Sequence, residues 1–176
     1  ITAQLSAADE RVRRAAVMAF ATIGDVGSVA ELAKAMQTAK AGELQNLELA
    51  MASLQGGLKV DQAILDLLKA GKDLNRAGLI NVLARRGATA AVPMLLAEVR
   101  GAEVNGGRAA ARALGKLAGA NDLQSLLDQL GSITAAPVRS EFEAALAKVI
   151  ERSTDVAGRS RLVAGALAKA SAAESR

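Results

Sequence analysis

The chain has 176 residues, no cysteine, no histidine and a formal net charge of +4. The missing cysteine excludes disulfide bonds and thiolate metal sites, and the missing histidine removes the usual general base and imidazole ligand at neutral pH. Hydrophobic residues make up 51% of the chain and aromatic residues 1%, so alanine supplies much of the apolar fraction. This composition favours closely packed helices.

The stretch 12–36 predicts two helices joined by a short turn. Apolar residues recur with helical spacing in both halves: Val12, Ala16, Phe20 and Ile23 in the first, and Val29, Leu32, Ala33 and Met36 in the second. Gly24 and Asp25 interrupt the pattern between them, because glycine ends helices and aspartate caps the next one. Two helices joined by so few residues must lie antiparallel and pack stripe against stripe.

The same outline recurs along the chain. Five repeats are predicted, at about 6–40, 41–72, 73–102, 103–134 and 135–170, each with a first helix (helix A) and a second helix (helix B). The expected helices of the first repeat are 9–23 and 28–38, and those of the second are 43–55 and 60–70. In the third repeat the helices lie around Leu79–Leu83 and Val92–Val99, and in the fourth they are 104–117 and Leu123–Leu130. The helices of the fifth repeat begin near Pro137 and Val156. A period near 30 residues predicts an all-α chain, an α-α superhelix of about five stacked antiparallel helix pairs. Leu83 and Leu127 are expected in its core.

Several motifs resemble those of a known family. The first repeat matches the pattern D-x-x-V-R-x-x-A-x-x-A-L-x-x-I-G-D at Asp9, Val12, Arg13, Ala16, Ala19, Ile23, Gly24 and Asp25. Phe20 stands where leucine is usual, and Val29 and Leu32 match the continuation of the pattern. Ala91-Val92-Pro93 and Ala113–Leu117 fit the same scheme. The chain resembles HEAT repeats, and its short period is similar to the bacterial HEAT-like subtype first associated with phycobilisome lyases.

The resemblance implies that helices A form a convex face and helices B a concave one. It also implies that Arg13 and Arg139, which match in register, pair with acids or carbonyls of a neighbouring repeat. Partner contacts are expected on helices B, at Glu31, Lys34, Gln37, Asp66, Lys69, Glu98, Gln124 and Asp128. A basic patch is a candidate on helices A, at Arg76, Arg85, Arg86, Arg108, Arg112 and Lys116, although an ordinary solvated face is the favoured explanation of such charges.

The end of the chain repeats its beginning. Residues 171–176 (SAAESR) resemble residues 6–11 (SAADER). Helical repeat arrays need polar capping repeats, and none is visible. The chain is therefore expected to be a fragment of a longer protein.

Motifs that carry chemistry are scarce. The sequence has no phosphate-binding or dinucleotide-binding glycine pattern, and Asn105–Arg108 before a helix fits a turn and cap better than an anion site. No catalytic residue, cofactor or metal is predicted.

The leading hypothesis is a non-catalytic protein-interaction or scaffold domain, which binds a partner along the concave helix-B face or spaces domains of a larger bacterial protein. One alternative is a lyase-type accessory enzyme for chromophore or cofactor attachment, which usually needs an aromatic pocket. Another is nucleic-acid binding through the basic helix-A patch, against which stands the lack of Trp and Tyr for base stacking. No apolar run approaches the ~18 residues of a membrane span.

Overall fold

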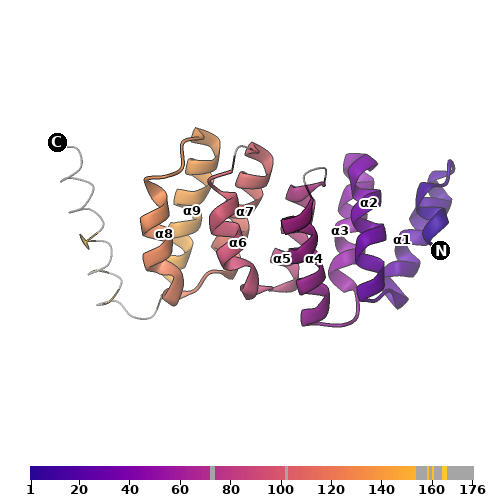
Figure 1. The fold of residues 1–176 in the computed structure, drawn as a ribbon, viewed down its shortest axis with the longest axis horizontal. Helices are drawn as coiled ribbons and strands as arrows, with labels where there is room; N and C mark the ends of the chain where they lie inside the picture. The colour runs from indigo at the N-terminus through magenta and orange to yellow at the C-terminus, as the bar shows by residue number, and fades with distance from the viewer. Residues whose placement is uncertain (72–73, 102, 154–157, 159, 161–163, 166–176) are drawn as a thin grey trace. The chain divides into compact units, whose positions relative to one another are not determined.

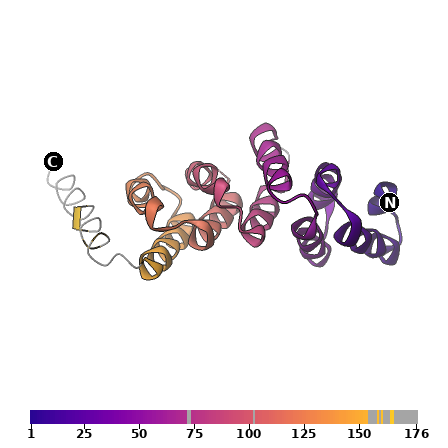
Figure 2. The same cartoon turned by 90° about the horizontal axis from the view of Figure 1, so that it is seen from below.

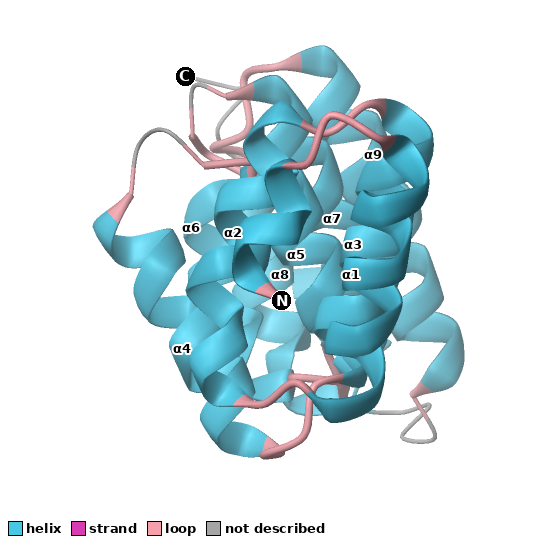
Figure 3. Cartoon of the chain, turned by 90° about the vertical axis from the view of Figure 1, so that its right-hand side faces the viewer, coloured by secondary structure: helices cyan, strands magenta, loops and turns pink. Residues whose placement is uncertain are grey.

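The computed structural model describes residues 1–71, 74–101, 103–153, 158, 160, 164 and 165. Every regular element of these residues is a helix (Figure 3), which confirms the all-α prediction. The order is η1 (Thr2–Ser6), α1 (Glu10–Ile23), η2 (Val26–Ser28), α2 (Val29–Thr38), α3 (Ala41–Ser53), α4 (Leu58–Ala70), α5 (Arg76–Arg86), η3 (Thr89–Ala91), α6 (Val92–Glu98), α7 (Val104–Leu117), η4 (Ala120–Asp122), α8 (Leu123–Leu130) and α9 (Ala136–Arg152), where η marks a 3-10 helix.

The chain divides into an N-terminal body, residues 1–91, and a C-terminal body, residues 92–176 (Figure 1). In the N-terminal body α1, α3 and α5 form one row and α2 and α4 form a second row (Figure 2). The second row packs on the first, since α2 contacts α3 and α4 contacts α5. In the C-terminal body α7 packs on α9, α6 contacts α7 and α8 contacts α9. Both bodies thus consist of adjacent helices packed in pairs.

The helix ends follow local signals in the sequence. The Asp9 carboxylate accepts a hydrogen bond from the Arg11 amide at 2.8 Å at the start of α1, and the Gly24 amide bonds the Phe20 carbonyl at its end. Such caps satisfy backbone groups that a helix leaves unpaired. The predicted range 104–117 agrees with α7, and the other predicted bounds differ by a few residues.

The core of each body lies between its packed helices. In the N-terminal body Leu32, Met36, Met51 and Ile64 are at most 1% exposed, and Leu83 of α5 is fully buried as predicted. In the C-terminal body the fully buried large side chains include Leu95, Leu114, Leu126 and Phe142. Leu127 is only half-buried, so the prediction that it belongs to the core is wrong and its neighbour Leu126 takes that place.

The predicted apolar stripe of α1 is also partly wrong. Ala16 and Phe20 are buried, whereas Val12 is 37% exposed and Ile23 is 67% exposed. These two residues lie near the ends of the helix. Helical spacing identifies a shared side of the helix but not how far the neighbouring helix extends along it.

Small residues bring α7 and α9 close together. A Cβ atom added to Gly107 would lie 3.0 Å from a methyl group of Val138, and one added to Gly115 would lie 3.1 Å from the Cβ atom of Ala145. Larger residues at these two positions would push the helices apart, so the sequence of α7 sets this packing.

Val156, Val163 and Leu167, which were predicted for the second helix of the fifth repeat, lie outside the described residues, as do residues 171–176. Within the described part of the chain, no helix is both long enough and apolar enough to cross a membrane.

Candidate functional site

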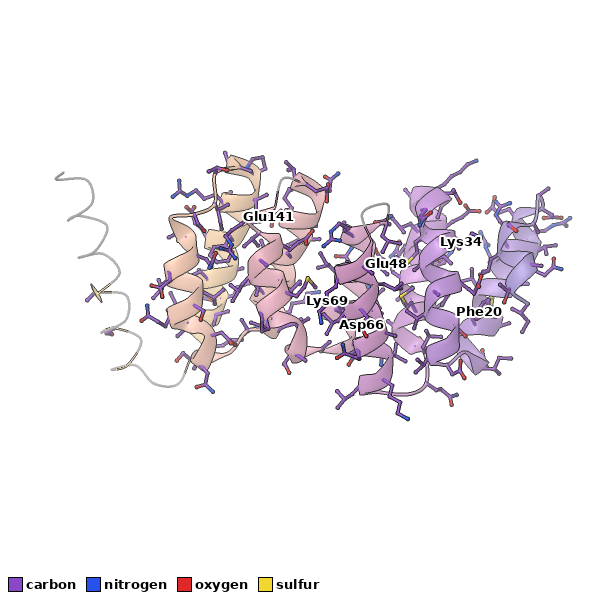
Figure 4. All side chains as sticks on the ribbon, viewed as in Figure 1. Phe20, Lys34, Glu48, Asp66, Lys69 and Glu141 are labelled. Carbon is purple, nitrogen blue, oxygen red and sulfur yellow. The ribbon has the colours of Figure 1, made fainter. Side chains whose placement is uncertain are left out.

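The predicted partner-binding residues of the N-terminal body lie on the row formed by α2 and α4. Lys34 and Gln37 of α2 and Asp66 and Lys69 of α4 are exposed, and Glu31 is half-buried. Figure 4 labels Lys34, Asp66 and Lys69 on this row. We call these five residues the α2–α4 face.

Polar contacts on the α2–α4 face stay within one helix. The Gln62 amide donates to the Asp66 carboxylate at 2.7 Å, and the Lys69 ammonium lies 3.7 Å from the same carboxylate. The Asp66 and Lys69 side chains are more than 60% exposed. Exposed pairs of this kind contribute little to stability, so exchanging them for contacts with a partner costs little.

The predicted residues of the C-terminal body are Glu98, Gln124 and Asp128. Gln124 and Asp128 are exposed on α8, where the Gln124 amide donates to the Asp128 carboxylate at 2.9 Å. Glu98 is half-buried at the end of α6. This glutamine–aspartate pair has the same spacing of four residues as the pair on α4.

Most residues of the predicted basic patch form hydrogen bonds or ion pairs within the protein. Arg86 is 9% exposed and pairs with Asp61, and its guanidinium donates to the carbonyl oxygens of Ala52 (2.8 Å), Leu54 (3.2 Å) and Gly57 (2.8 Å). Because α3 ends at these carbonyls, the planar guanidinium satisfies acceptors that the helix leaves unpaired. The expectation that Arg86 forms part of an exposed basic surface is therefore wrong.

Two further arginines of α5 also have partners. The Arg76 guanidinium donates to the carbonyl oxygens of Leu68 at 2.8 Å and Gly71 at 3.1 Å, at the end of α4. Arg85 lies 3.8 Å from the carboxylate of Glu48, whose side chain is 8% exposed. These cations hold neighbouring helices together.

In the C-terminal body Arg108 and Arg112 of α7 converge on Glu141 of α9. Both guanidinium groups lie 3.0 Å from the same carboxylate oxygen. The hydrogen bond from Arg108, followed by that from Arg112, lowers the pKa of Glu141 below its ordinary value of 4.5. Lys116, the remaining residue of the predicted patch, is exposed.

Arg13 and Arg139 both bond groups that lie outside their own helices. Arg13 pairs with Glu43 of α3 and donates to the carbonyl oxygens of Ala7 and Ala8. Its hydrogen bond lowers the pKa of Glu43. Arg139 donates to the Leu130 carbonyl at 3.4 Å, at the end of α8.

Arg76 belongs to the same series. Arg13, Arg76 and Arg139 are spaced 63 residues apart, and each precedes by seven residues the large side chain near the end of its helix: Phe20, Leu83 and Leu146. All three donate to carbonyl groups of the segment before their own helix. We call these three residues the arginine anchors. The register of the motifs identified Arg13 and Arg139, and the equal spacing was the signal for Arg76.

Glu48 was not predicted from the sequence. It lies on α3 (Figure 4), is 6% exposed, and accepts a hydrogen bond from the Asn81 amide of α5 at 3.0 Å. A glutamate on an amphipathic helix is usually exposed, so burial of this one followed only from the fold.

The start of α7 is capped by a carboxylate. Glu103 accepts hydrogen bonds from the backbone amides of Asn105 (2.9 Å) and Gly106. The free amide groups that would bind an anion are thus already satisfied, which agrees with the predicted turn and cap.

Two hollows flank α1 and α3. One of about 480 Å³ lies between the two helices, and another of about 650 Å³ lies beside it and is also lined by η1 and the end of α2. Arg14, Val17 and Asn46 line both hollows. Neither was predicted from the sequence.

Among the described residues, no group of three or more Asp or Glu side chains is placed to hold a metal ion. Comparisons with protein-family models, curated proteins and solved structures find no match to this chain.

Proposed function

We propose that this chain is a HEAT-like helical repeat domain that binds a protein partner and has no catalytic role of its own. The repeat assignment is supported by the arginine anchors, which perform the same task at equal intervals. It is also supported by the contacts between successive helices A, which join residues about one repeat apart. These are Arg13 with Glu43, Asn81 with Glu48, and Arg108 with Glu141.

One observation carries the proposed binding surface. Arg13, Arg85 and Arg108 bond to carboxylates of other helices, whereas Asp66 and Lys69 bond to each other within α4. The α2–α4 face therefore presents both signs of charge without tying them to the fold. Its partner is a protein segment that carries both signs of charge, laid across α2 and α4.

The surface is tested by site-specific photo-crosslinking in the cell that makes the protein. A benzophenone side chain replaces Gln37 on the α2–α4 face, and a matched variant carries it at Lys148, which is exposed on α9. Crosslinks to one defined protein are expected from position 37 and not from position 148. Combining the first variant with Lys34→Glu and Asp66→Lys should abolish them while the helical circular dichroism is unchanged. Equal crosslinking from both positions, or none, would overturn the proposed surface.

The two alternative functions have weaker support. Nucleic-acid binding through helices A would draw on arginines that already bond Asp61, Glu48 and Glu141. A steep loss of affinity with rising salt would favour it nonetheless. A lyase-type accessory enzyme needs an aromatic pocket, and the two aromatic residues, Phe20 and Phe142, are buried. A purified sample carrying bound pigment would favour this alternative.

A further inference from the structure

The hollow between α1 and α3 has exposed apolar side chains on both of its edges. Met18 of α1 is 65% exposed and Leu49 of α3 is 45% exposed, and both line the hollow. On the inner side of the same helices, Phe20 is 7% exposed and Met51 is fully buried. Large apolar side chains left in solvent around a hollow are typical of an interaction site.

The shape of the hollow fits one helix. Its lining runs from Arg14 to Ala21 on α1 and from Asn46 to Ser53 on α3, so each α3 position lies one repeat after its α1 counterpart. This is about two helical turns, or roughly 10 Å. A groove between two neighbouring helices accepts the side-chain ridge of a third.

The polar groups of the lining favour a helix over an extended chain. The Ser53 hydroxyl donates to the Leu49 carbonyl at 3.0 Å and is already satisfied. Asn46 supplies the other uncharged polar side chain of the lining. An extended peptide would bury backbone groups against this apolar surface without partners, whereas a helix satisfies its own backbone.

Charge gives the third constraint on the occupant. Among the described residues lining this hollow, Arg14 alone is charged. Arg14 lies 3.2 Å from Glu10, but both side chains are more than 60% exposed, so the pair is easily exchanged for another carboxylate. An acidic side chain of the occupant would complement Arg14.

We propose that the hollow between α1 and α3 is a docking groove for an amphipathic α-helix of a partner protein. Two apolar side chains one turn apart sit between Met18 and Leu49, and an acidic side chain one turn before them meets Arg14. The groove lies on the row opposite to the α2–α4 face, so it is a second binding surface that does not depend on the first.

The test uses the whole chain and a synthetic peptide. A fluorescent, hydrocarbon-stapled helix of about 14 residues holds its conformation in water. It carries two leucines spaced four residues apart and a glutamate one turn before them, and a matched peptide has lysine in place of the glutamate. Fluorescence anisotropy should show saturable binding, with the glutamate peptide favoured by up to about fivefold.

Variants of the groove separate its two parts. Met18→Ser and Leu49→Ser should each weaken binding of the glutamate peptide about tenfold. Arg14→Gln should remove the preference for glutamate over lysine and leave leucine-dependent binding. Lys34→Glu, on the α2–α4 face, should change neither. Because all four positions are exposed, unchanged thermal unfolding is the check that each variant is folded.

Three results would overturn the proposal: no saturable binding up to about 1 mM peptide, wild-type affinity in both serine variants, or equal affinity for the two peptides. A fourth result that would overturn it can come from sedimentation of the chain alone. A dimer that Met18→Ser dissociates would assign the groove to a second copy of the chain. Crosslinking from position 37 is unaffected by any of these, so failure of this groove and failure of the proposed function are distinguishable.

Discussion

Arg86 of α5 and Asp61 of α4 form an ion pair whose side chains are 9% and 10% exposed, respectively. The same guanidinium bonds three backbone carbonyls at or just beyond the end of α3. One side chain therefore connects three helices of the N-terminal body. Removing it would leave the buried Asp61 carboxylate and the part-buried carbonyls of Ala52 and Leu54 without this partner.

Arg86→Met should lower the free energy of unfolding by about 3–5 kcal/mol, because breaking a buried pair leaves an uncompensated charge. Urea denaturation followed by circular dichroism measures this loss. Arg11→Met is the control, since the Arg11 side chain is 92% exposed, and it should change stability by less than about 0.5 kcal/mol. Similar values for the two variants would contradict the structural role of Arg86.

Gly24→Ala should destabilise the N-terminal body although the backbone conformation of Gly24 is open to any residue. The added Cβ atom would lie 2.5 Å from Leu54 and would also clash with the Phe20 carbonyl. Overpacking of this kind costs roughly 1–3 kcal/mol. Gly42→Ala, in the first turn of α3, meets nothing within 4 Å and should be neutral or stabilising by up to about 1 kcal/mol. Thermal unfolding compares them, and equal midpoints would contradict the close packing at Gly24.

Leu126→Ala and Leu127→Ala should destabilise the C-terminal body to different extents, because only Leu126 lies in its core. Leu126 is fully buried and its truncation should cost about 2–5 kcal/mol, whereas half-buried Leu127 should cost distinctly less. Urea midpoints of the two variants give the comparison. The reverse order would mean that the buried side of α8 is misassigned.

The Glu141 carboxylate should make stability depend on pH in the acid range. Its pKa is lowered in the folded chain, so its contribution is fully present above the unfolded value of about 4.5 and is lost as pH falls through the folded pKa. Glu141→Gln should therefore be less stable than wild type at about pH 6, with the difference shrinking towards about pH 3. Urea midpoints across this range measure the effect, and a difference that stays constant with pH would rule out the carboxylate as its source.

Helix positions followed closely from the sequence because glycine, proline and capping residues act locally. The predicted start at Val104 and break after Leu117 agree with α7, and the breaks at Gly24, Gly71 and Gly87 all end helices. Burial was harder to predict, since Ile23 continues the apolar spacing of α1 and yet is 67% exposed.

Contacts between charged residues of different helices could not be predicted from each helix alone. Arg108 and Arg112 share no helix with an acid, which made them resemble a free basic patch. Their partner Glu141 lies 33 and 29 residues further along the chain. Glu48 pairs with Asn81 over a similar separation. A search for opposite charges about 30 residues apart would have found the two pairs with Glu141, whereas a search within each helix could not.

The positions of the arginine anchors bear on how many helices such a chain can gain or lose at a time. They occur in α1, α5 and α9, while α3 and α7 carry Leu47 and Gly107 seven residues before Leu54 and Leu114. In the repeat array that we propose, alternate helix pairs are therefore chemically different, and we expect the smallest interchangeable module to be four helices rather than two. Duplication or excision of one such module would keep every anchor in its setting, whereas a change by a single pair would join helices that are not matched to each other.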